Sequence, residues 1–151
     1  MDENVKTARH EAAHAVAALH YDLPFEFASI EVGLGTLGTT RFAVSKVCHA
    51  IPLFCGPLAE REWSEFNGQP NNPGITLYGG DRDALNYLKE GFGDVDCLQP
   101  DAWELLGKPE VQHQIDRVAG ALLEHKRLTH DQVIAVSEFT ERLCSTDWLD
   151  A

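Results

Sequence analysis

Residues 5–19 repeat apolar side chains at steps of three and four, and this spacing is the strongest constraint that the sequence places on its fold. At about 100° per residue, the step of an α-helix, these positions gather into one stripe. The stripe consists of Val5, Ala8, Ala12, Ala15, Val16 and Leu19. His10 and His14 fall on the other side of the helix, among alanines. We therefore expect a helix with a core face of larger side chains and a second face on which two histidines stand among methyl groups.

The two histidines belong to a five-residue block, residues 10–14, that reads His-Glu-Ala-Ala-His. Histidines four apart project from neighbouring turns of one helix face, so both imidazoles can reach one Zn²⁺, and Glu11 beside them can take a proton from a water molecule that the metal activates. The block alone is equally compatible with two solvated histidines and an acid favoured by the helix N-terminus. A hydrolytic zinc site with Glu11 as catalytic base therefore needs support from the rest of the chain.

The composition limits the number of domains and the classes of partner. A chain of 151 residues, 44% of them hydrophobic, is enough for one domain with a core, so we expect a single domain over residues 1–151. The formal net charge of −12 and the lack of basic runs argue against nucleic acid as a partner. The acidic first residues and the lack of a long apolar run predict neither a signal peptide nor a membrane span. The four scattered cysteines fit a reducing compartment, so we expect a soluble, cytoplasmic protein.

The sequence predicts a mostly α fold with a small β-sheet, an α+β arrangement. Alternating side chains indicate strands at 25–32 and 37–44, separated by a glycine-rich turn. Residues 47–66 have helical character, although Pro52 and Pro57 must either kink this segment or divide it. We therefore expect a sheet of two strands or slightly more, placed after the histidine helix.

The C-terminal half follows a turn-rich segment at 67–80 and predicts a bundle of helices. Proline at a first helical position and a threonine–glutamine capping box mark two of the helix starts. The expected helical segments run from Asp81 to about Glu90, around Trp103 to Leu106, onward from Pro109, and onward from the capping box of Thr129 and Gln132, with Val133, Val136 and Leu143 on the last.

A rival motif, Gly33-Leu-Gly35-Thr-Leu-Gly38, has the G-x-G-x-x-G spacing of dinucleotide-binding loops, with Glu60 about twenty residues on. That function requires the last glycine to open a helix whose N-terminus receives the pyrophosphate. Here the glycine opens a segment with strand character. A phosphate-binding lysine is also missing, because Thr39 stands in its place. We therefore favour a glycine turn between two strands.

A hydrolytic zinc site usually takes three protein ligands and leaves one position for water, so the two histidines need a third partner. Four acidic residues are candidates, and spacing ranks them nearly level: Glu60, Glu62, Asp81 and Asp83. Each also has a plain structural interpretation. The glutamates suit a solvated helix face, and the aspartates suit the cap and first turn of a helix. The five other histidines lack ligand spacing, and we expect them on helix surfaces: His20, His49, His113, His125 and His130.

The order of these landmarks resembles the peptidase domain of the FtsH-type ATP-dependent zinc metalloproteases. That family combines a His-Glu-x-Gly-His helix, a Leu-Gly-x-Thr segment, a Gly-x-x-Ala-Glu helix, and Gly-Ala-x-Asn-Asp opening a further helix. This chain has His-Glu-Ala-Ala-His at 10–14, Leu-Gly-Thr-Thr at 37–40, Gly-Pro-Leu-Ala-Glu at 56–60 and Gly-Gly-Asp-Arg-Asp at 79–83. The closing helices from Pro109 are also similar, so the resemblance spans nearly the whole chain.

The resemblance implies a zincin-like active-site helix in a zinc metallopeptidase. By position, His10 and His14 would be zinc ligands, Glu11 the catalytic base and Asp83 the third ligand. The strand at 37–40 would be the edge along which an extended polypeptide substrate lies, with little demand on side-chain identity. A separate ATPase partner and assembly of identical chains would follow from the same resemblance, and the sequence decides neither.

The departures from the family pattern are also informative. Ala13 replaces the usual glycine, and the Gly80-Asp81-Arg82 run leaves Asp81 as a competing ligand beside Asp83. These 151 residues hold no ATPase module, so we expect a free-standing enzyme to be limited to unfolded chains, flexible termini or peptides. The alternative from another class is a regulatory binding module that keeps the peptidase scaffold without turnover.

Overall fold

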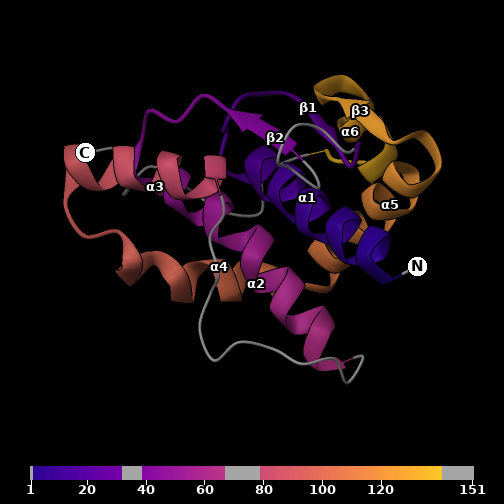
Figure 1. Cartoon of the computed structure of the whole chain (residues 1–151), viewed down its shortest axis with the longest axis horizontal. Coiled ribbons are helices and arrows are strands. Elements are labelled where there is room, and N and C mark those ends of the chain that lie inside the picture. Colours follow the sequence, from indigo (N-terminus) through magenta and orange to yellow (C-terminus); the bar gives the residue numbers. More distant parts are fainter. Residues whose placement is uncertain (1, 32–38, 67–78, 141–151) are drawn as a thin grey trace.

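The computed structural model describes residues 2–31, 39–66 and 79–140, and the fold is mostly α with a small β-sheet (Figure 1). Two 3₁₀ turns, at Val47–His49 and Asp96–Leu98, precede α2 and α4. In chain order the helices and strands are α1 (Asp2–His20), β1 (Phe25–Ser29), β2 (Thr39–Phe42), α2 (Ala50–Phe66), α3 (Gly79–Phe92), α4 (Gln99–Leu106), α5 (Pro109–His125), β3 (Arg127–Thr129) and α6 (His130–Ser137).

Helix α1 is the centre of the fold, and it runs between α2 and α5 (Figure 1). It also contacts β1, β2 and α6. Every residue from Glu11 to Tyr21 is buried. Both faces of the helix are therefore covered along this stretch, the face of larger side chains and the face on which alanines surround the histidines. The alanines are small enough to let neighbouring backbones approach closely.

The sheet has three antiparallel strands in the order β2-β1-β3. Strand β1 covers the first five residues of the strand expected at 25–32, and β2 lies within the strand expected at 37–44. A sheet slightly larger than two strands was expected, but the position of β3 was not. Between Phe25↔Phe42 and Ala28↔Thr40, β1 advances three residues while β2 advances two, so β1 carries a bulge. Among the described residues, β2 pairs with β1 alone and β3 pairs with β1 alone, so these two strands lie at the edges of the described sheet.

Helix α2 continues through both prolines, so of the two expected outcomes for 47–66, a kink or a division, the division does not occur. Pro52 falls in the first turn, where an N–H has no helical acceptor and its loss is harmless. Pro57 lies inside the helix. Its missing hydrogen bond is outweighed by burial, because every residue from Ala50 to Ala59 is buried. The helix therefore holds its shape through packing against α1, α3 and α4.

The C-terminal helices begin where their caps predict. Pro109 opens α5, and Thr129 caps α6 by accepting from the Gln132 backbone N–H, while the Gln132 side chain accepts from the Thr129 backbone N–H. Helix α3 begins two residues before the expected Asp81, and Leu143 of the expected last helix lies outside the described residues. Among the residues described, no helix combines the length and the apolar character that a bilayer span requires.

Candidate metal centre

Two rows of residues spaced by four meet where α1 packs against α2. His10 and His14 form the row on α1, and Pro52, Gly56 and Glu60 form the row on α2. Residues four apart lie above one another on a helix face, so each row is a line along its helix. His14 contacts the Pro52 end and His10 contacts the Glu60 end, so the two helices run antiparallel here. The groups that hydrogen-bond the two Nδ1 atoms, the Pro52 carbonyl and the Glu60 carboxylate, therefore come from regular steps along one helix.

Hydrogen bonds fix the tautomer of both imidazoles. His14 Nδ1 lies 2.9 Å from the Pro52 carbonyl oxygen, which can only accept, so this nitrogen carries its proton. His10 Nδ1 lies 2.9 Å from Glu60 Oε2 and donates to the carboxylate in the same way. The two Nε2 atoms then face each other at 3.1 Å. In neutral rings with Nδ1 protonated, both Nε2 atoms present lone pairs toward each other, an arrangement that a cation between them would stabilise.

Glu60 is held between two partners. Its Oε2 meets His10, and its Oε1 lies 3.5 Å from Lys6 Nζ. Burial alone raises the pKa of the Glu60 carboxyl, but the hydrogen bond and charge interaction with His10, together with Lys6, bring that pKa below its ordinary value. The carboxylate is therefore ionised at neutral pH and bonds the far side of the His10 ring from Nε2. This contact makes Glu60 a positioning residue for His10 in the described structure.

The pair of nitrogens fits the geometry of a zinc site. Two imidazole nitrogens at about 2.0–2.1 Å from Zn²⁺, at a tetrahedral angle of about 109°, lie about 3.3 Å apart. The observed 3.1 Å between His10 Nε2 and His14 Nε2 is close to that value. The second nitrogen of each ring also has the acceptor that zinc-binding histidines usually have, a carboxylate for one and a backbone carbonyl for the other. The histidine pair therefore fits a divalent cation in both its inner and its supporting contacts.

Gly56 makes room for His14. A Cβ atom at this position would lie 2.6 Å from both Cδ2 and Cε1 of His14, and it would also meet Nε2. Such approaches are well inside the optimal separation of about 3.5–4.0 Å for non-bonded atoms. His14 is only 1% exposed, so its ring has no free space to move into. Only glycine lets α2 pass this close to the ring.

Glu11 lies beside the histidine pair with its carboxylate held in place. Thr40 of β2 donates its Oγ1 proton to Glu11 Oε1 at 2.7 Å, and Glu11 Oε2 lies 4.0 Å from His10 Nε2. Glu11 is 6% exposed. Phe42, also on β2, packs its ring edge-on against His14 at 5.3 Å between centroids. Strand β2 therefore forms the second wall of the site, and the Thr40 contact was not expected from the sequence.

The expected third ligand is not gathered with the histidines. Asp83 lies exposed in the first turns of α3, Glu62 is exposed on α2, and the side chain of Asp81 lies outside the described residues. Within the described ranges, no three His, Cys, Asp or Glu side chains are grouped closely enough to hold a metal ion. The structure places the two candidate ligands, His10 and His14, next to the candidate base, Glu11. The third metal ligand stays a prediction.

The other histidines divide into two groups. Three of them lie at the surface as expected: His113 and His125 are exposed and His130 is half-buried. The expected surface location is wrong for His20 and His49, which are buried. His20 Nε2 bonds Gln114 Oε1 at 2.8 Å across the α1–α5 contact. Burial lowers the pKa of His20 and outweighs that hydrogen bond, which raises it. His49 Nδ1 accepts from the backbone N–H groups of Ser45 and Lys46.

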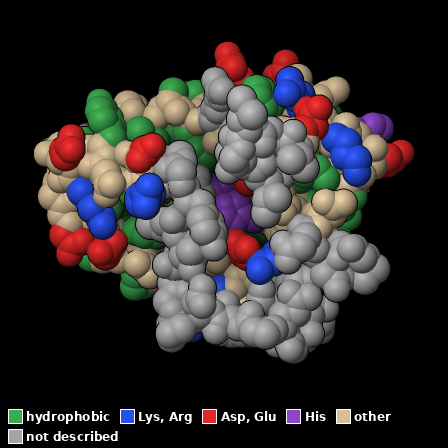
Figure 2. All heavy atoms as spheres, in the orientation of Figure 1, with side chains coloured by type: hydrophobic (Ala, Val, Ile, Leu, Met, Phe, Trp, Pro, Cys, Tyr) green, Lys and Arg blue, Asp and Glu red, His purple; other side chains and the backbone are tan. Residues whose placement is uncertain are grey.

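The candidate centre is open to one side of the molecule. Figure 2 shows histidine atoms near the middle of the face drawn, with carboxylate atoms beside them. The His10 side chain is 12% exposed, so a small ion or water can reach it while His14 stays covered. The solvated, structural interpretation of this histidine pair is therefore excluded by its burial. The glycine-rich run at 33–38 lies outside the described residues, but Thr39 after it opens strand β2, which is incompatible with a phosphate-binding helix start.

Comparison with known proteins gives no family. The sequence matches no protein-family model and no curated protein.

Proposed function

We propose that this chain is a zinc-dependent metalloendopeptidase that hydrolyses peptide bonds in unfolded polypeptides, flexible termini or peptides. The observation that carries the proposal is the pair of tautomer-locked imidazoles with Nε2 atoms 3.1 Å apart, next to the buried carboxylate of Glu11. A solvated structural pair would need neither the hydrogen-bonded Nδ1 atoms nor the glycine that admits the ring. The resemblance to the FtsH-type peptidase domain supports the same reaction.

A zinc ion on His10 and His14 would polarise the scissile carbonyl and lower the pKa of a bound water toward neutrality. Glu11 accepts the proton from the attacking water and later delivers it to the leaving amine nitrogen. Thr40 occupies Oε1 of Glu11, so Oε2, the oxygen nearer His10, is the one placed to move the proton. Glu60 and the Pro52 carbonyl keep the two rings oriented throughout. Asp83 stays the proposed third ligand on the resemblance alone.

The substrate proposal follows from the edge position of β2. An extended polypeptide can add to a free strand edge through main-chain hydrogen bonds, with little dependence on its side chains. Thr40 and Phe42 on this strand contact Glu11 and His14, so a segment bound along β2 passes close to the candidate centre. We propose loose sequence specificity, a cytoplasmic setting, and a separate ATPase wherever folded substrates are degraded.

The test is cleavage of casein by the zinc-loaded wild type and by the Glu11→Gln variant. The proposal expects cleavage by the wild type, no cleavage by Glu11→Gln, and equal zinc content in both. Glu104→Gln, which changes an exposed carboxylate on α4, is the matched control and keeps activity. Retained cleavage in Glu11→Gln would remove that residue from the mechanism. Zinc bound by a wild type that cleaves nothing would favour the alternative, a regulatory module.

A further inference from the structure

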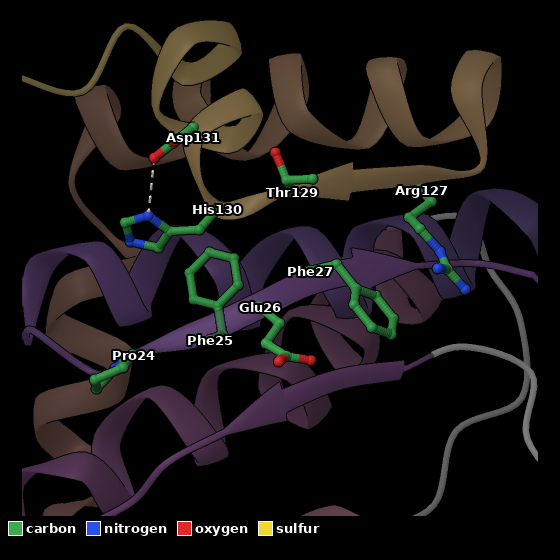
Figure 3. Close-up of a pocket in the computed structure, with 8 residues that line it drawn as sticks. All are labelled: Pro24, Phe25, Glu26, Phe27, Arg127, Thr129, His130 and Asp131. Atoms are coloured by element: carbon green, nitrogen blue, oxygen red, sulfur yellow. Dashed lines mark ion pairs between the residues drawn. The ribbon is translucent and has the colours of Figure 1, made fainter.

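A second site lies away from the histidine pair, in a surface pocket of about 570 Å³ between β1, β3 and the start of α6 (Figure 3). This volume is within the range of about 300–1,000 Å³ that small-ligand pockets have. None of His10, Glu11 or His14 lines it. The pocket is therefore a separate feature of the surface, and the proposed reaction leaves it without a role.

Two phenylalanine rings form the apolar part of the pocket because of the bulge in β1. The extra residue turns Phe25 to the same face as buried Ala28, while Phe27 stays half-exposed. Figure 3 shows their rings at two ends of the pocket with the Glu26 side chain between them. The His130 ring closes one end, at 4.9 Å from the Phe25 centroid and 63° to its plane. Phe25 is only 7% exposed, so the aromatic surface of the pocket comes mainly from the half-buried Phe27 and His130 rings.

The chain itself places a guanidinium group on one of these rings. Arg127 lies over Phe27 with its Cζ atom 4.3 Å from the ring centroid, which is the geometry of a cation–π contact. Its Nε donates to Glu31 Oε1 at 2.8 Å, so the positive charge of Arg127 is already balanced. Arg127 therefore covers one face of the Phe27 ring and gives an example, within this chain, of a guanidinium group packed on a phenyl ring of the pocket.

The remaining charges at the pocket favour a cation as its occupant. Glu26 and Asp131 add two exposed carboxylates to the lining, and Arg127 is neutralised by Glu31. Asp131 lies 3.6 Å from His130 Nδ1 and stands in the first turn of α6, where its charge offsets the positive end of the helix. The chain as a whole carries a net charge of −12, which attracts basic partners from a distance. An anionic occupant would meet the two exposed carboxylates at the pocket and the negative net charge of the chain.

We propose that this pocket binds the cationic side chain of an arginine or lysine residue in an extended polypeptide, with arginine preferred because its planar group stacks on phenyl rings. The Phe25 ring also touches Phe42, 6.4 Å away, and Phe42 packs against His14. An occupant that contacts Phe25 is therefore linked to His14 through a single intervening ring, that of Phe42. The binding needs no hydrolysis, so it holds or fails independently of the proposed function.

The experiment is an NMR titration of the ¹⁵N-labelled full chain with a blocked pentapeptide, Gly-Ala-Arg-Ala-Gly. The control peptide replaces arginine by citrulline, which has the same shape and no charge. We expect amide shifts concentrated at Phe25, Glu26, Phe27 and Asp131, and an affinity for the arginine peptide about two- to fivefold higher than for citrulline, the size of an exposed cation–π contact. Equal affinities, shifts elsewhere, or no binding would overturn the proposal.

Three variants locate the binding. Glu26→Gln and Phe27→Leu should each lower the affinity for the arginine peptide about two- to fivefold. Each substitution removes one attraction for the cation, at a side chain that is not buried. Glu104→Gln removes the same charge from exposed α4 and leaves the affinity unchanged. An equal loss in Glu104→Gln and Glu26→Gln would assign the attraction to net charge and refute a specific pocket.

Discussion

Replacing Gly56 by alanine tests the packing on which the candidate centre depends. The new methyl carbon would lie 2.6 Å from two carbon atoms of the His14 ring, about 1 Å inside the optimal separation. The ring cannot swing away cheaply, because it is 1% exposed and its Nδ1–H is bonded to the Pro52 carbonyl. We therefore expect Gly56→Ala to displace His14 and break that hydrogen bond.

The net magnitude follows from three contributions. Overpacking a buried site costs about 1–3 kcal/mol. Losing the His14–Pro52 hydrogen bond costs about 1 kcal/mol more. Alanine is better than glycine inside a helix by about 1 kcal/mol, which offsets the second contribution. The free energy of unfolding should therefore fall by about 1–3 kcal/mol, and Tm by several degrees, at about 2–4 °C per kcal/mol for a chain of this size.

The assay is urea denaturation followed by circular dichroism, with Gly120→Ala as the matched control. Gly120 lies inside α5 with nothing within 4 Å of an added Cβ, so the same substitution there stabilises the helix by up to about 1 kcal/mol. The two variants are thus predicted to move in opposite directions. If Gly56→Ala unfolds at the same urea concentration as Gly120→Ala, then His14 does not occupy the space described.

Three further substitutions probe contacts that helix α1 makes with the rest of the chain. Glu60→Gln weakens the acceptor for His10 Nδ1 and lowers zinc affinity by about 10- to 100-fold, measured by competition with a chelator. Thr40→Val removes the donor to the buried carboxylate of Glu11 and lowers the free energy of unfolding by about 1–3 kcal/mol. Burial lowers the pKa of His20 below 6.5, so the unfolded chain binds its proton first. The contribution of neutral His20 to the free energy of unfolding is thus fully present above pH 6.5. Below pH 6.5 it falls by at most about 1.4 kcal/mol per pH unit, until the pKa of His20 in the folded chain is reached. His20→Gln removes this part of the pH dependence.

Each of these predictions has a control and a contrary result. Glu104→Gln alters an exposed glutamate on α4 and keeps zinc affinity; an equal loss of affinity in both variants would show that Glu60 does not position His10. Unchanged stability in Thr40→Val would mean that water replaces the threonine hydroxyl at Glu11. His125→Gln, an exposed change, keeps the wild-type pH dependence. If His20→Gln keeps it too, other groups cause the acid sensitivity.

The sequence predicted the elements whose signals are local. The period of α1, the start of α5 at Pro109 and the capping box of α6 all depend on residues within one or two turns. Strand β3 was missed because three residues between two helices, Arg127–Thr129, are too few to show an alternating pattern. The continuity of α2 through Pro57 was also missed, since packing along its buried turns decides it and propensity does not.

The candidate site was predictable in its residue types and not in its contacts. His10, Glu11 and His14 follow from helix geometry, but the role of Glu60 depends on which His10 nitrogen it meets, fifty residues away. The burial of His20 likewise depends on Gln114, on a helix 94 positions further along. One signal was present in the sequence: Gly56 and Glu60 repeat the four-residue step of the histidines, as expected for two helix rows that face each other.

Zinc content by mass spectrometry after equilibrium dialysis tests the central claim most directly, on the wild type, on His10→Gln and on the exposed-histidine control His113→Gln. The two imidazoles with facing Nε2 atoms predict one zinc ion per chain in the wild type and in His113→Gln, and its loss from His10→Gln with the helical circular dichroism unchanged. A wild type without zinc, or a folded His10→Gln that retains it, would contradict the assignment of this histidine pair as a metal centre.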